Sequence, residues 1–95
     1  MNIEILDEAE NDIVNAMRFY EAQSNNLGTY FLDSILSDID SLYIYAAIHT
    51  KVNGYYRLLS KRFPFAIYYK LKGDVIFIYA VLDCRQNPST TQKRL

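Results

Sequence analysis

The first half of the chain changes from an alternating pattern of apolar residues to a helical one. Residues 2–6 alternate polar and apolar side chains, which is typical of a short, half-buried strand. Asp7 follows, and an aspartate there is expected to cap a helix that runs to about Gln23. The predicted inward face of this helix has the residues Ala9, Ile13, Ala16, Met17 and Tyr20.

A second helix is predicted after the turn-forming residues 24–28. It runs to about Tyr45, and its apolar stripe consists of Phe31, Ile35, Ile39, Leu42 and Ala46. The acidic residues of this segment, Asp33, Asp38 and Asp40, fall largely outside that stripe. Two helices joined by so short a link predict an antiparallel hairpin.

The second half of the chain has the pattern of a sheet. Residues 46–53 are expected to be a connection, and strands are predicted over residues 55–60, 65–71 and 75–82. The last of these is apolar at every position, which indicates a central strand that is covered, at least in part, on both faces. We therefore expect one α+β domain over residues 1–95, in the order β-α-α-β-β-β. It has a mainly antiparallel, four-stranded sheet with the helical hairpin on one face, and residues 86–95 form an exposed tail.

Charge is divided unequally along the chain. Residues 1–50 hold nine acids and one base, a net of −8, whereas residues 51–95 hold nine bases and two acids, a net of +7, which sum to −1. Two interpretations stay open: the halves attract each other, or the basic sheet faces an acidic partner. Cys84 has no second cysteine to pair with, and the chain shows neither a signal peptide nor a long apolar run, so a cytoplasmic protein is expected. No phosphate loop, metal-ligand cluster or nucleophile motif is present, and no metal or cofactor is expected.

Five short motifs occur in an order that resembles the RelE/ParE superfamily of bacterial toxins. They are residues 18–21 (RFYE), 27–31 (LGTYF), 54–57 (GYYR), 62–69 (RFPFAIYY) and 80–88 (AVLDCRQNP). The resemblance covers nearly the whole chain. It implies the toxin of a type II toxin–antitoxin pair, with a cognate antitoxin as partner and DNA gyrase or the ribosome as target.

Differences from the superfamily motifs favour its ParE-like branch, which poisons gyrase by binding. In the RelE-like branch, which cuts messenger RNA on the ribosome, several basic residues act together. Arg57 and Arg85 match two of them, but the others fall at Leu59 and Ala66, and Asp83 replaces the usual histidine. Two alternatives remain: a ribosome-dependent endonuclease with Arg57, Lys61, Arg62 and Arg85 as candidate catalytic residues, and an inactive relative that serves as an interaction module.

The candidate binding residues form two groups. Contacts with the target are expected from Arg57, Arg62, Tyr69 and Arg85, although Arg57 or Arg85 could instead pair with an acid such as Asp83. Contacts with the basic residues of an antitoxin are expected from Asp33, Asp38 and Asp40. A homodimer formed through a sheet edge also stays open.

Overall fold

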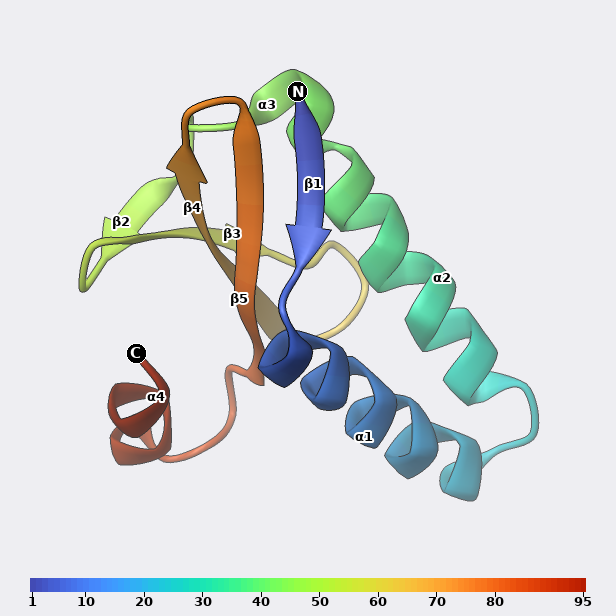
Figure 1. The fold of residues 1–95 in the computed structure, drawn as a ribbon. Coiled ribbons are helices and arrows are strands. Elements are labelled where there is room, and N and C mark those ends of the chain that lie inside the picture. Colours follow the sequence, from blue (N-terminus) through green and yellow to red (C-terminus); the bar gives the residue numbers. More distant parts are fainter.

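The computed structural model describes residues 1–95, and Figure 1 shows a sheet with two long helices packed on one side. In chain order the elements are β1 (Asn2–Ile5), α1 (Asp7–Gln23), α2 (Leu27–Asp40), α3 (Leu42–Tyr45), β2 (Thr50–Val52), β3 (Tyr55–Leu59), β4 (Phe65–Lys72), β5 (Val75–Asp83) and α4 (Pro88–Arg94). The α+β class and the helical hairpin are thus as predicted. No helix is both long and apolar enough to cross a membrane.

The sheet has five strands in the order β1-β5-β4-β3-β2, so the prediction of four strands was wrong. The missed strand is β2, which lies within the expected connection and pairs antiparallel with β3. Between them, Asn53 and Gly54 have positive φ angles of 53° and 84°, the conformation that an Asn-Gly hairpin turn requires. With three residues, β2 is too short for its alternation to be recognised, and only this turn signals it.

The sheet is mixed because β1 pairs parallel with β5. The backbone N–H groups of Asn2 and Leu6 donate to the carbonyls of Asp74 and Ile78, both at 3.0 Å. As predicted, β5 is central, since β1 and β4 flank it. Ile76 and Ile78 are buried on the helix side, whereas Phe77 and Tyr79 on the other face are only half-buried. The pairing with β1 stops at Ile5, which leaves the last residues of β5 without a strand on that side.

The helices follow the predicted stripes but differ at their ends. Asp7 is the first residue of α1 rather than its cap, since Leu6 holds the cap position without a side-chain hydrogen bond. The second predicted helix is divided into α2 and α3 at Ser41. The Ser41 hydroxyl donates to the Asp38 carbonyl at 2.6 Å and so competes with the backbone N–H that would continue the helix.

Each face of the sheet has its own apolar cluster. The larger one lies between the sheet and the helical hairpin and includes Phe31, Ile35, Ile67, Tyr69 and Ile78. The smaller one, on the face turned away from α1 and α2, consists of Ala66, Tyr68, Ala80 and Leu82. We call this second face the open face.

The end of the chain is not the exposed tail that was expected. Residues 88–94 form α4, and Leu95 packs against the small cluster of the open face. Asn87 caps this helix by accepting a hydrogen bond from the backbone of Ser89 at 3.0 Å, and Pro88 occupies a first-turn position. Asn-Pro at the start and Lys93 and Arg94 in the last turn are the sequence signals of this helix.

Candidate functional site

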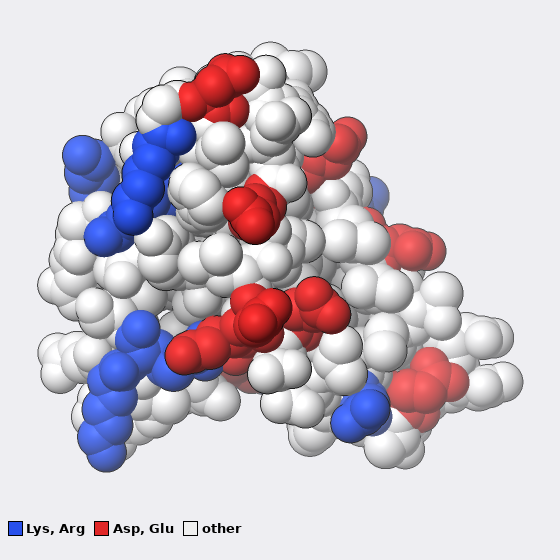
Figure 2. Space-filling model, viewed as in Figure 1, with Lys and Arg blue, Asp and Glu red and all other residues white.

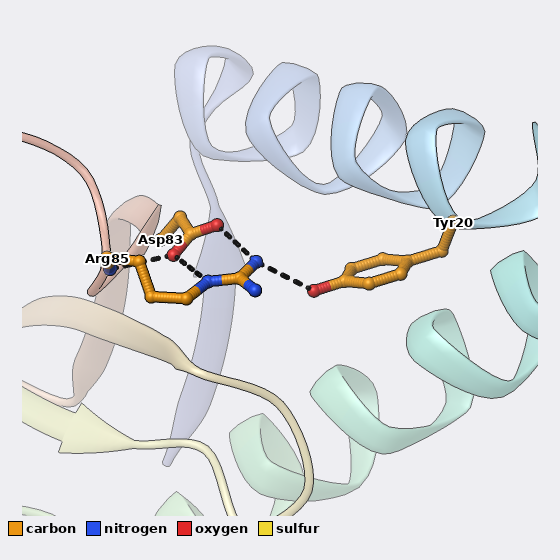
Figure 3. A network of polar contacts seen from close by, with 3 residues as sticks. All are labelled: Tyr20, Asp83 and Arg85. Carbon is orange, nitrogen blue, oxygen red and sulfur yellow. Dashed lines mark hydrogen bonds and ion pairs between the residues drawn. The ribbon is translucent and has the colours of Figure 1, made fainter. Parts of the chain in front are cut away.

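Arg85, just beyond the end of β5, belongs to a polar network with Asp83 and Tyr20 (Figure 3). Its Nε and Nη2 donate to the two carboxylate oxygens of Asp83 at 3.0 and 2.8 Å, and Nη2 lies 3.4 Å from the Tyr20 hydroxyl. These bonds to the guanidinium lower the pKa of Asp83, and the carboxylate raises the pKa of Arg85. The network fixes the direction of Arg85, whose side chain is still 60% exposed to solvent.

Aromatic rings surround Tyr20 beneath this network. Tyr20 lies 4.9 Å from Phe63 and 5.1 Å from Phe31 between ring centroids, and Phe63 lies 5.6 Å from Tyr30. Phe19 and Tyr30 are 58% and 49% exposed at the edge of the cluster. Arg85 and these rings together form a surface of the kind that is enriched at protein interfaces, where arginine and aromatic residues are frequent.

The turn from β3 to β4 brings Lys61 and Arg62 next to the same cluster, since both directly precede Phe63. Its two ends are held in place. The Ser60 hydroxyl donates to the Asp38 carboxylate at 2.7 Å, and the Cys84 N–H donates to the Pro64 carbonyl at 2.7 Å. The cations of this turn are therefore displayed on a fixed backbone.

Arg57 lies on the other side of the sheet from Arg85. Its neighbours Tyr56 and Leu58 pack in the helix-side cluster, so the alternation of β3 directs Arg57 to the open face. Arg85 reaches Tyr20, which belongs to the helix side. The two leading candidates are thus not brought together, and the Nε of Arg57 is buried without a hydrogen-bond partner.

Tyr69 is a core residue and is unavailable as a target contact. It is 0% exposed, stacks on Tyr56 at 5.2 Å and accepts a hydrogen bond from the Ala47 N–H at 3.1 Å. Its hydroxyl also hydrogen-bonds with Nδ1 of His49. Burial raises the pKa of Tyr69 and lowers that of His49. In the sequence, Tyr69 alternates in phase with Phe65, Ile67 and Leu71, but only the structure shows that this is the face buried beneath the helices.

The three acids of α2 separate into two exposed residues and a buried one. Asp33 and Asp40 are exposed, and Leu36 and Tyr43 nearby in the sequence are also exposed, at 42% and 54%. Asp38 is only 4% exposed and accepts the hydrogen bond from Ser60. Asp38 therefore anchors the β3–β4 turn. It is too deeply buried to contact an antitoxin, so that prediction was wrong for this residue.

An ion pair between α1 and α4 was not expected from the sequence. Arg94 donates to both oxygens of Asp12 at 2.7 and 3.0 Å, and its Nε lies 3.3 Å from Glu8. Asp12 also accepts the Val81 N–H at 3.0 Å, where β5 lacks a neighbouring strand. Beside this pair lies a cleft of about 420 Å³, whose lining includes Phe19, Asp83, Gln86 and Thr90. The cleft is continuous with the Arg85 network through Asp83.

Comparisons with known proteins give one informative result, a similarity of fold. No protein-family model and no curated protein matches the sequence. Among solved structures, a chain of the "Chromosomal ParDE TA system from P. aeruginosa" superimposes with a TM-score of 0.77 and 20% sequence identity. The superposition covers 85% of this chain and 92% of that one. The two chains share one fold.

The superposition includes most of this chain, so both the helical hairpin and the sheet are part of the likeness. At 20% identity the similarity is one of backbone architecture, and it assigns no role to any side chain.

Proposed function

We propose that this protein is the toxin of a type II toxin–antitoxin pair and that it acts as a ParE-like toxin, by binding its target rather than by cleaving RNA. The observation that carries the proposal is the ParDE fold. Exposed arginine and aromatic side chains at one end of that fold support it. We call this end the aromatic end; it consists of Phe19, Tyr30, Arg62, Phe63 and Arg85.

Binding is favoured over cleavage by the positions of the cations. An endonuclease must stabilise a crowded, negative phosphate with several groups at once. Arg57 and Arg85 point to opposite sides of the sheet, and Arg85 already pairs with Asp83. A pre-oriented guanidinium beside exposed rings suits a protein partner better, because such anchors lose little conformational entropy on binding.

The proposed target is DNA gyrase, and a supercoiling assay with the purified protein tests it. We expect inhibition by the wild type and a loss of about tenfold or more in potency for Arg62→Glu combined with Tyr30→Ala. Lys93→Glu, a charge reversal on exposed α4, is the control for nonspecific electrostatic effects. Undisturbed supercoiling at a large excess of the protein would contradict the gyrase assignment.

A translation assay separates the two modes of action. Intact messenger RNA in the presence of the protein is expected, because the cations are dispersed. Cleavage in register with the reading frame would instead identify a ribosome-dependent endonuclease. Normal growth of a bacterial host that expresses the protein without an antitoxin would favour the inactive interaction module.

The outer side of α2 and α3 is the proposed antitoxin surface. Exposed Leu36 and Tyr43 offer apolar area, and exposed Asp33 and Asp40 offer negative charge. An amphipathic segment with lysine or arginine beside its apolar residues would fit both features. We infer that the cognate antitoxin presents such a segment.

A further inference from the structure

At the end of the open face away from Arg85, acidic residues lie on one side of β5 and lysines lie on the other. The register pairs Glu4 with Phe77, and Phe77 with Lys70. A row across this face therefore reads acid on β1, aromatic on β5 and cation on β4. Since neighbouring strands are about 4.8 Å apart, the acid and the cation of this row are about 10 Å apart.

The cationic side of this surface is held in place by aromatic rings. Lys70 Nζ lies 4.4 Å from the centroid of the Tyr55 ring and 5.6 Å from that of Tyr79. Lys72 Nζ lies 5.9 Å from both Phe77 and Tyr79. No carboxylate pairs with either lysine. Both ammonium groups are thus directed by cation–π contacts, and no carboxylate of this chain neutralises them.

The acidic side forms a groove of about 570 Å³ next to the same rings. Glu4, Asp7 and Glu8 line it together with Tyr79 and Arg94, and Arg94 pairs with Glu8 at 3.3 Å. Glu4 and Asp7 make no ion pair. In Figure 2, which looks obliquely at this side, blue side chains gather on the left and red ones lie in the centre and along α1.

We propose that this part of the open face binds a second copy of the chain. A two-fold axis that runs above β5, parallel to the strands, would place the β4 side of one copy over the β1 side of the other. Lys70 of each copy would then lie over Glu4 of its partner. Lys72 would lie one row farther along, with its ammonium group directed back toward Phe77 and Tyr79, and the aromatic residues of β5 would meet at the axis. Such an interface is self-complementary. Leu95 and α4 cover the other end of the open face, so the two sheets would meet only at this end and diverge toward α4.

A nucleic-acid strand fits this surface less well, although lysine and aromatic residues often bind one. The groove carries two carboxylates without an ion pair, those of Glu4 and Asp7, and they would repel a phosphate backbone. A partner with both signs of charge is therefore favoured, and the chain itself offers the matching arrangement.

The expected dimer is weak. Four strands and about five residues per strand give a flat area of about 300 Å², well below the roughly 800 Å² per partner of a standard interface. We therefore expect a dissociation constant on the order of 10–100 μM. It should weaken several-fold between 50 and 500 mM salt, because the interface depends on exposed charges.

Sedimentation equilibrium over about 5–500 μM protein, with a charge exchange, tests the proposal. Lys70→Glu with Lys72→Glu, and separately Glu4→Lys with Asp7→Lys, should each weaken self-association about tenfold or more. An equimolar mixture of the two variants should form a heterodimer, because each presents the charge that the other lost. Lys51→Glu with Lys61→Glu is the matched control; Lys51 lies over the Tyr56 ring of the helix-side cluster, and Lys61 lies in the β3–β4 turn.

Three results would overturn the proposal. They are a wild-type protein that stays monomeric at 500 μM, dimers that persist in the Lys70/Lys72 variant, and no recovery in the mixture. A fluorescent 20-nucleotide single strand, as RNA and as DNA, is added to the monomeric protein as a further arm. The surface would instead be assigned to a nucleic acid if two results are found together. The wild-type protein would bind the strand without dimerising, and the Lys70/Lys72 variant would not bind it.

Discussion

The hydroxyl of Tyr69 joins the core of the sheet to the connection that precedes β2. It accepts the N–H of Ala47, which has a positive φ of 72°, and it hydrogen-bonds with His49. A non-glycine residue in this conformation is strained, so the bond to Tyr69 helps to hold it. One buried tyrosine thereby sets the course of the chain between α3 and β2.

Tyr69→Phe tests this role at the residue scale. The change leaves the Ala47 N–H without its partner, and we expect the free energy of unfolding to fall by about 1–2 kcal/mol. Chemical denaturation measures it. Tyr79→Phe is the control, because the Tyr79 hydroxyl bonds to no other residue; an equal loss in both variants would contradict the assignment.

The pH dependence of stability should report on His49. Burial lowers its pKa from 6.5, so the unfolded chain holds the proton more tightly than the folded one. The contribution of His49 is fully present above pH 6.5 and is lost as the pH falls from there toward the folded pKa. The free energy of unfolding should change less between pH 7.5 and pH 5.5 in His49→Gln than in the wild type. An equal change in both proteins would exclude the effect.

At the scale of elements, the helical hairpin depends on one close approach. Gly28, at the start of α2, lies against α1, where an added Cβ would be 2.6 Å from the Met17 carbonyl oxygen and 2.8 Å from the Glu21 Cβ. Glu21 also accepts the Gly28 N–H at 2.9 Å. Two helices can approach this closely only where the side chain is absent.

Gly28→Ala should therefore destabilise the fold although alanine is the better helix former. We expect a loss of about 1–3 kcal/mol, because the helices must move apart. A shift in the urea midpoint measures it. Thr29→Ala, at the exposed neighbouring position, is the control, and a Gly28→Ala protein as stable as the wild type would show that the hairpin adjusts without cost.

The attachment of α4 depends on the pair of Asp12 and Arg94. Asp12→Asn keeps an acceptor for the Val81 N–H but loses the bidentate ion pair, so α4 should detach more often while the sheet remains intact. Faster amide exchange in residues 91–95 with little change in β5 is expected. Arg94→Gln should have the same effect, and the double variant should add little. Unchanged exchange in both would show that Leu95 alone holds the helix.

For the whole molecule, the proposed partners occupy different regions: the aromatic end for the target, the outside of α2 and α3 for the antitoxin, and part of the open face for a second copy. Asp33→Lys with Asp40→Lys should weaken the complex with the antitoxin about tenfold, because both charge contacts become repulsive. Titration at low and high salt measures this. Asp74→Lys, in the β4–β5 turn, is the control; salt-independent affinity of the wild type would contradict the charge contribution.

The sequence by itself determined the two long helices, every strand except β2, and the α+β class. Apolar spacing predicted the buried stripe of α2 and the central position of β5, because these depend only on which side of a helix or strand each residue occupies. The sequence also indicated Arg85 and Asp83 as a possible ion pair but could not choose between this pair and a free arginine.

Only the tertiary structure decided which of these residues act together. It paired β1 with β5, buried Tyr69 and Asp38, and separated Arg57 from Arg85 across the sheet. It also joined Asp12 to Arg94 across 82 positions of the chain. The physical reason is that periodicity records only how each segment divides its own surface. Burial, ion pairs and strand order depend on the segments that fold against it.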